Sequence, residues 1–163
     1  MITPYVPTPF STVAAMLRLA QVTANDYVID LGSGDGRIVI CAAKMGARAL
    51  GYEHDKRLIE ISRRDAAKEN VAHLASFRQC DLFEADISAA SVVTIYLLPD
   101  VNIQVRDKLF ATLKPGTRIV SHDYDMGLWV PAKKMILDTP IKRPEQTRNS
   151  RIYLWIRPEY ERI

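Results

Sequence analysis

Apolar and polar residues along this chain predict a strand, a tight turn and a helix near residue 30. Residues 27–31 form a short, largely apolar run, which breaks into three glycines at alternate positions. Apolar residues then recur at helical spacing from Ile38 to Met45. Glycine suits such a turn, because it accepts positive φ and leaves room for a ligand beside the backbone. The free N–H groups at the start of the helix offer donors to a polar ligand.

Strands and helices continue to alternate over most of the chain. Helical patterns precede the first strand, with an N-cap expected at Thr8, and follow Asp55 and Pro99. Further strands are predicted where apolar runs recur, at 49–53, 77–81, 91–98, 117–121, 133–137 and 152–156. The last two strands follow each other without a helix between them. We therefore expect one α/β domain over residues 1–163, with a Rossmann-like, mostly parallel sheet flanked by helices and an antiparallel last strand.

Three of the predicted strands carry an acidic residue at or next to their C-terminal end. These residues are Asp30, Glu53 and Asp81. In an open α/β sheet the carboxyl ends of parallel strands meet at one edge, and ligands bind there. Glu53 lies about 20 residues beyond the glycines, where a carboxylate takes the ribose hydroxyls of a nucleotide. The pattern therefore predicts a nucleotide-type cofactor at this edge.

The glycine spacing distinguishes between cofactors. A dinucleotide fingerprint, G-x-G-x-x-G/A, needs a small residue where this chain has Arg37. The order G-x-G-x-G after Asp30 instead resembles the class I S-adenosylmethionine-dependent methyltransferases, although another nucleotide binder stays open. The resemblance implies that the turn holds the methionine part of S-adenosylmethionine, that Glu53 binds its ribose, and that Asp81 binds its adenine amino group.

Longer strings narrow the resemblance to one branch. Residues 4–9 (PYVPTP), 30–39, 62–63 and 81–83 are similar to small bacterial and archaeal methyltransferases, which are themselves similar to the mitochondrial ATP-synthase c-subunit lysine methyltransferases. That branch implies N-methylation of a protein lysine. We find no counterpart of the membrane-anchoring segment of the mitochondrial members, which argues against a membrane-embedded substrate.

The resemblance also implies which residues contact S-adenosylmethionine and its product, S-adenosylhomocysteine. They come from the stiff, proline-rich lead-in, the glycine turn and the ends of the second and third strands. The cofactor-binding residues expected are Tyr5, Thr8, Asp30, Gly32, Ser33, Gly34, Gly36, Glu53, His54, Asp81 and Leu82.

The acceptor side is predicted from the residues after the fourth strand. Enzymes that methylate amide or nucleobase amino nitrogens commonly carry Asp/Asn-Pro-Pro-Tyr/Phe there, whereas this chain has residues 96–99, Tyr-Leu-Leu-Pro. A lysine acceptor must lose its proton, which costs about 4 kcal/mol at neutral pH, and desolvation in an apolar channel lowers its pKa. We therefore expect Tyr96 and Pro99 to be catalytic residues in a channel shared with Leu97, Tyr5 and Trp129.

Other interpretations stay open. Tyr96 and Trp129 would equally serve as core residues, and His122 is better explained as a structural histidine than as a proton relay. The alternatives to a lysine methyltransferase are a small-molecule or RNA methyltransferase and a catalytically silent module that binds the cofactor. RNA would require a basic groove with stacking aromatic residues. The C-terminal region has few candidates for such a groove, namely Arg143, Arg148 and Arg151 with Tyr153.

Composition and charge change this interpretation little. The 163 residues carry a net charge of +3, too small to argue for stable nucleic-acid binding. The positive excess is C-terminal, because residues 131–163 hold 8 Lys/Arg against 4 Asp/Glu. Three scattered histidines lack metal-ligand spacing, so we expect no metal site. With no signal peptide, no apolar run long enough to span a membrane and only two cysteines, we expect a reduced protein of the cytoplasm.

Overall fold

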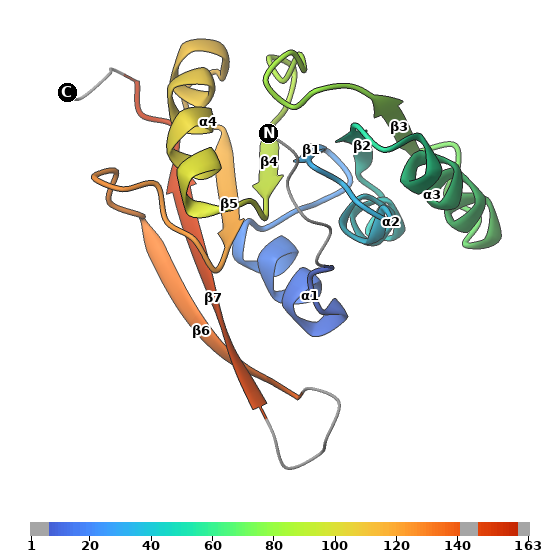
Figure 1. Ribbon diagram of the computed structural model, residues 1–163, viewed down its shortest axis with the longest axis horizontal. Coiled ribbons are helices and arrows are strands. Elements are labelled where there is room, and N and C mark those ends of the chain that lie inside the picture. Colours follow the sequence, from blue (N-terminus) through green and yellow to red (C-terminus); the bar gives the residue numbers. More distant parts are fainter. Residues whose placement is uncertain (1–6, 141–146, 160–163) are drawn as a thin grey trace.

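A seven-stranded sheet organises the chain, and strand β1 (Tyr27–Leu31) lies near its middle (Figure 1). The computed structural model describes residues 7–140 and 147–159. The strand order is β3-β2-β1-β4-β5-β7-β6. The other strands are β2 (Arg48–Glu53), β3 (Ala75–Gln79), β4 (Val92–Ile95), β5 (Arg118–His122), β6 (Lys133–Pro140) and β7 (Thr147–Ile156). The first five run parallel and β7 is antiparallel to both its neighbours, which confirms the predicted mixed sheet.

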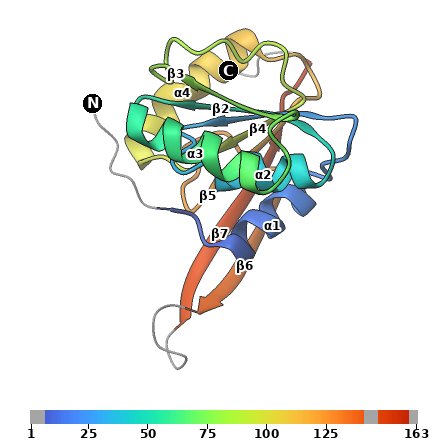
Figure 2. The ribbon, with the colours of Figure 1, turned by 90° about the vertical axis from the view of Figure 1, so that its right-hand side faces the viewer.

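Helices cover both faces of the sheet (Figure 2). Helices α1 (Phe10–Leu19), α2 (Arg37–Lys44) and α3 (Lys56–Lys68) contribute to one apolar core, and α4 (Pro99–Thr112) contributes to the other. Alternate residues of β1 enter the two cores, with Val28 in the first and Ile29 in the second. This burial on both faces explains why the strand sequence is nearly continuous in apolar residues.

Two strands end earlier than the sequence predicted. Strand β3 ends at Gln79, because Asp81 belongs to a turn in which its Oδ1 accepts a hydrogen bond of 2.9 Å from Phe83 N–H. Strand β4 spans Val92–Ile95 and stops where its pairing with β5 ends. The apolar residues 96–98 therefore leave the sheet and lead into α4, although their composition predicted strand.

The start of α1 also differs from expectation. Pro9 is the N-cap and makes no side-chain hydrogen bond, so Thr8 is not the cap. The Thr8 hydroxyl is instead hydrogen-bonded to His122, far away in the sequence. At the end of α2, Met45 continues the apolar spacing of the sequence but is 40% exposed, and it lies just after the last helical residue, Lys44.

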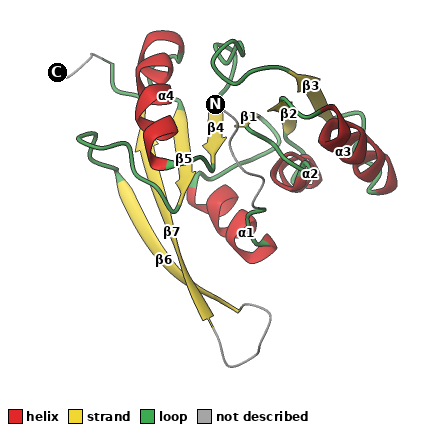
Figure 3. Cartoon of the chain, in the orientation of Figure 1, coloured by secondary structure: helices red, strands yellow, loops and turns green. Residues whose placement is uncertain are grey.

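Strands β6 and β7 form a hairpin that extends past the rest of the sheet (Figure 3). β7 pairs with β5 only from Ile152 to Ile156, whereas residues 147–151 pair with β6 alone. The strands are longer than the sequence predicted, and part of the expected loop at 139–150 lies outside the described residues. Within the part of the chain that the structure describes, no helix is long and apolar enough to cross a membrane.

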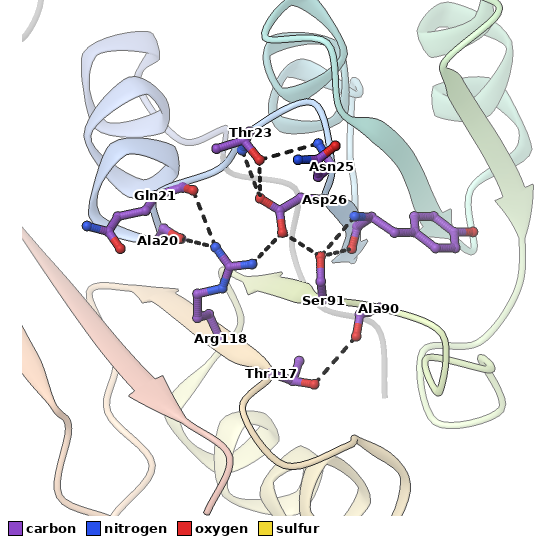
Figure 4. Close-up of polar contacts among 10 residues, drawn as sticks. Ala20, Gln21, Thr23, Asn25, Asp26, Ala90, Ser91, Thr117 and Arg118 are labelled. Atoms are coloured by element: carbon purple, nitrogen blue, oxygen red, sulfur yellow. Dashed lines mark hydrogen bonds and ion pairs between the residues drawn. The ribbon is translucent and has the colours of Figure 1, made fainter.

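A polar network that the sequence did not reveal lies at the N-terminal ends of β1 and β5 (Figure 4). The Asp26 carboxylate accepts hydrogen bonds from Thr23 N–H and Ser91 Oγ, each of 2.8 Å, and from Arg118. Burial would raise the pKa of the Asp26 carboxyl, but these bonds and the charge of Arg118 hold that pKa below its ordinary value. Because Arg118 also donates to Ala20 O at 2.6 Å, the network joins the end of α1 to two strands.

Candidate active site

The turn between β1 and α2 approaches the backbone of β2 closely. Gly32 N–H and Ser33 N–H both donate to Tyr52 O at 2.9 Å, and Gly36 N–H donates to Ser33 O at 2.9 Å. Gly32, Gly34 and Gly36 have φ values of 79°, 56° and 82°. These values lie in the left-handed region that favours glycine. The alternate glycines therefore shape the turn as the sequence predicted.

Close packing explains two of the glycines further. A Cβ on Gly36 would lie 2.8 Å from the Phe77 ring and 2.9 Å from Ser62 Cβ. A Cβ on Gly51, in β2, would lie 2.5 Å from both Ser33 Cβ and Ser33 Oγ. Gly51 was not among the predicted site residues, although a glycine inside a strand is a signal of close backbone approach.

Glu53, the last residue of β2, holds the turn from the side. Its Oε1 accepts a hydrogen bond of 3.0 Å from Gly34 N–H, and its Oε2 accepts one of 2.8 Å from Asp55 N–H. The side chain is only 6% exposed, and His54 Nδ1 lies 3.1 Å from Oε2. A carboxylate has about four acceptor positions, so Glu53 can still accept hydrogen bonds from a ligand.

Asp30 is buried next to this turn, near the end of β1. Its exposed fraction is 2%, and its Oδ1 accepts a hydrogen bond of 2.8 Å from Thr94 Oγ1 on β4. Burial raises the pKa of the Asp30 carboxyl to about 7, against the lowering effect of Thr94, and the nearby charges of Glu53 and Asp35 raise it further. A cationic ligand beside Asp30 would favour its ionised form.

A cavity of about 220 Å³ opens where these elements meet. Most residues predicted to contact the cofactor line it, from the segment before α1, the glycine turn and the ends of the strands. Those lining residues are Thr8, Asp30, Gly32, Ser33, Gly34, Glu53, His54 and Leu82, joined by Tyr96 from the predicted acceptor side. The structure thus brings together residues far apart in the sequence at the predicted edge of the sheet.

Four other predicted residues are placed differently. Gly36 lies in the turn but does not line the cavity. Asp81 is exposed, does not line the cavity, and uses Oδ1 in its own turn, so its contact with adenine stays a prediction. Tyr5 lies outside the described residues. Pro99 is the first residue of α4, where the missing N–H costs no helix hydrogen bond, and its catalytic role is untested.

Of the two described aromatic residues expected around the acceptor, Tyr96 lines the cavity and Trp129 does not. The ring centroid of Tyr96 lies 4.1 Å from that of His122 and 6.3 Å from that of Tyr124. Trp129 packs against Phe110 and Trp155, with centroid distances of 4.2 and 5.8 Å. Trp129 is therefore a partly buried residue packed against the second core, away from the cavity lining.

The cavity fits S-adenosylmethionine, which carries a sulfonium and an ammonium cation. Two buried acidic side chains, Asp30 and Glu53, line the cavity and favour positive charge. The buried hydroxyl of Ser33 has no hydrogen-bond partner among the described residues, so a polar ligand atom can satisfy it. No cluster of metal-ligating side chains occurs within residues 7–140 and 147–159.

This fold and cavity define a class I S-adenosylmethionine-dependent methyltransferase. The diagnostic features are the seven-stranded sheet with antiparallel β7 and the glycine turn between two acid-bearing strands. The ANTKMT methyltransferase domain matches residues 30–133. The chain belongs to this methyltransferase family and is an enzyme whose cofactor is S-adenosylmethionine.

Relatives extend the similarity over nearly the whole chain. A protein-lysine N-methyltransferase of Saccharolobus islandicus is 41% identical over 160 residues, which are 97% of this chain and 96% of the relative. The human ATP-synthase c-subunit lysine N-methyltransferase is 34% identical over 128 residues, 78% of this chain but 54% of the relative. A Salinibacter ruber protein solved in complex with S-adenosyl-L-homocysteine, and described as an RNA methyltransferase, is 48% identical with a TM-score of 0.86, covering 96% of this chain and 97% of its own.

Proposed function

We propose that this enzyme methylates the ε-amino group of lysine in a protein substrate. The observation that carries the proposal is the character of the cavity wall on the acceptor side. Tyr96 and Leu97 line it with aromatic and aliphatic surface. The names of the Saccharolobus and human relatives, both lysine N-methyltransferases, support the same acceptor.

An apolar wall suits the chemistry of a lysine acceptor. S-adenosylmethionine, when bound, supplies an electrophilic methyl group on its sulfonium. The chain's part is to align the amine and to favour its neutral form, because a protonated amine has no lone pair. Removing water around the ammonium lowers its pKa, which offsets part of the roughly 4 kcal/mol needed to deprotonate it at neutral pH. Tyr96 and Leu97 are placed to exclude that water.

The contacts of the cavity carboxylates support activation of the lysine without a general base. Asp30 accepts from Thr94, Asp35 pairs with Arg37, Glu53 accepts from two backbone N–H groups, and Asp55 caps α3. Each already has a partner inside the protein. We propose that Asp30 and Glu53 serve the cofactor, Asp30 its cationic methionine part and Glu53 its ribose, while desolvation rather than a general base activates the lysine.

RNA is the second candidate acceptor, because the similar Salinibacter protein is described as an RNA methyltransferase. Aromatic side chains that stack on bases and cationic side chains that contact phosphates are the usual means of binding single-stranded RNA. Here the His122 ring is fully buried and the Tyr96 ring is half-buried against it. The described wall therefore favours a narrow aliphatic amine over a splayed base.

We further propose that the enzyme acts in the cytoplasm, where its two free cysteines, Cys41 and Cys80, stay reduced.

The acceptor is tested with radiolabelled S-adenosylmethionine and a cell extract. Labelled product is divided and digested with protease or with nuclease, and protein hydrolysates are analysed for methyl-lysine. We expect protease-sensitive label in methyl-lysine. Label found only in nuclease-sensitive material would replace this proposal with RNA methylation.

Tyr96→Ala and Tyr96→Phe test the wall itself. Loss of the ring re-admits water, so Tyr96→Ala should lower kcat at least tenfold while the Kd of S-adenosylhomocysteine changes less than threefold. Tyr96→Phe keeps the ring and should keep most of the activity. Wild-type kcat in Tyr96→Ala would show that Tyr96 is a packing residue only.

A further inference from the structure

Thr8 is buried in an unusual place. It lies in the irregular segment before α1, where residues are commonly exposed, yet it is only 4% exposed and lines the cofactor cavity together with Pro7. Its hydroxyl makes no helix cap. A different interaction must therefore hold this segment against the cavity.

Two side chains from distant elements hold Thr8. The first is His122, the last residue of β5, whose Nδ1 lies 3.2 Å from Thr8 Oγ1 in a hydrogen bond. The second is Arg37, the first residue of α2, whose Nη1 donates to Thr8 O at 2.9 Å. The side chain and the main chain of Thr8 are thus fixed separately, by two different elements.

His122 connects this contact to the acceptor side. The ring is fully buried, its centroid lies 4.1 Å from that of Tyr96, and its Nε2 lies 3.4 Å from Asp123 Oδ1. The backbone beside it is itself held, because Asp123 Oδ1 accepts a hydrogen bond from Arg151 N–H on β7. His122 therefore touches both the segment over the cavity and the aromatic wall.

Arg37 connects the same contact to the glycine turn. Its guanidinium binds Asp35 through Nε and Nη2, at 3.0 and 2.6 Å, and lies 4.4 Å from the centroid of the Phe10 ring. Asp35 lies between Gly34 and Gly36, so Arg37 is tied to the glycine turn as well as to Thr8. Arg37 is the residue that does not match a dinucleotide-binding turn. In this structure it forms an ion pair with Asp35 and a hydrogen bond to Thr8 O.

We propose that His122 and Arg37 are positioning residues that clasp Thr8 over the cofactor cavity, so that opening of this clasp limits cofactor exchange. The inference rests on the proposed placement of the cofactor in the cavity, but not on the identity of the acceptor. When Thr8 is clasped, Pro7 and Thr8 form one wall of the cavity and Tyr96 is held against His122. When the clasp opens, that wall moves and product leaves.

The test measures dissociation of S-adenosylhomocysteine by stopped flow, with Kd from calorimetry. Thr8→Val removes the hydroxyl at constant shape, and Thr8→Ser is the matched control that keeps it. His122→Phe removes the ring nitrogens and keeps a ring beside Tyr96. Loss of one hydrogen bond should raise the dissociation rate about fivefold in Thr8→Val and in His122→Phe, whereas Thr8→Ser should stay within twofold of wild type.

The double variant separates a clasp from independent packing effects. Because both substitutions remove the same contact, Thr8→Val with His122→Phe should dissociate about as fast as either single variant. Multiplied effects, or unchanged dissociation in Thr8→Val, would overturn the clasp. If His122→Phe does not fold, as judged by circular dichroism, the Thr8→Val and Thr8→Ser pair decides alone. Failure of the wild-type enzyme to bind S-adenosylhomocysteine would instead refute the proposed cofactor site, and the clasp with it.

Discussion

Replacing Glu53 probes the cofactor site and the turn at once. Its two carboxylate oxygens accept hydrogen bonds from Gly34 N–H and Asp55 N–H at 3.0 and 2.8 Å. Glu53→Ala therefore removes the proposed ribose contacts and leaves the Gly34 N–H without its acceptor. Glu53→Gln keeps the shape, but it replaces one acceptor oxygen by an NH₂ group that faces an N–H donor.

The magnitudes follow from the hydrogen bonds that are lost. Two ribose hydroxyls donating to the carboxylate contribute about 1.5–3 kcal/mol each, so Kd should rise roughly 10²- to 10⁴-fold in Glu53→Ala. An unpaired buried N–H costs about 1–3 kcal/mol of stability, and each kcal/mol lowers Tm by about 2–4 °C in a chain of this size. The variant should thus fold, with a measurably lower Tm.

Calorimetric titration with S-adenosylhomocysteine and thermal melting by circular dichroism measure both effects. Glu60→Ala is the matched control, because Glu60 is an exposed acid on α3 and its loss changes the net charge equally. We expect wild-type Kd and Tm in that control. A Kd in Glu53→Ala within threefold of wild type would refute the ribose contact, and an unchanged Tm would show that Glu53 does not hold the turn.

Two further predictions concern the packing and charge of the site, and a third concerns the stability of the fold. Gly51→Ala places a Cβ 2.5 Å from Ser33 and should lower both Tm and cofactor affinity, and normal calorimetric binding would contradict this. Because the Asp30 pKa is raised to about 7, binding of S-adenosylmethionine should tighten between pH 6 and 8 as the carboxylate ionises, and Asp30→Asn should abolish that dependence in calorimetry. A carboxyl with a lowered folded pKa stabilises above its unfolded pKa and loses that contribution as pH falls through the folded value. Asp26→Asn should therefore cost about 1–3 kcal/mol at pH 7, and thermal melts should show the difference vanish in strong acid.

The sequence predicted the elements of this fold better than their ends. The glycine turn was found because its residues are contiguous, and α1 was found because Val13, Met16 and Leu17 repeat at helical spacing and are buried. The end of β4 was missed because pairing with β5, not apolar composition, decides where the strand stops. Thr8 looked like an N-cap, but a long-range contact with His122 outweighs the local preference.

The same distinction holds for the candidate site. Asp30 and Glu53 could be predicted, because acids at strand ends meet at one edge of a parallel sheet. Thr94 could not, since its hydrogen bond to Asp30 depends on the register in which β4 lies beside β1. The contacts of Arg37 and His122 with Thr8 could not be predicted either, because Thr8 belongs to a segment before α1 that is distant from both in the sequence. Trp129 could not be assigned from the sequence, because an aromatic residue after a strand fits a channel and a core equally well.

The position of β7 has a consequence for how the enzyme is made. During synthesis the N-terminal segments emerge first, so β5 and β6 leave the ribosome before β7, which lies between them. Until β7 arrives, β5 has an open edge that is a template for pairing with other chains, and β6 has no partner strand. His122 lies on that open edge, opposite Ile152. The edge of β5 that carries His122 therefore stays open to pairing with other chains until the last described strand has been translated.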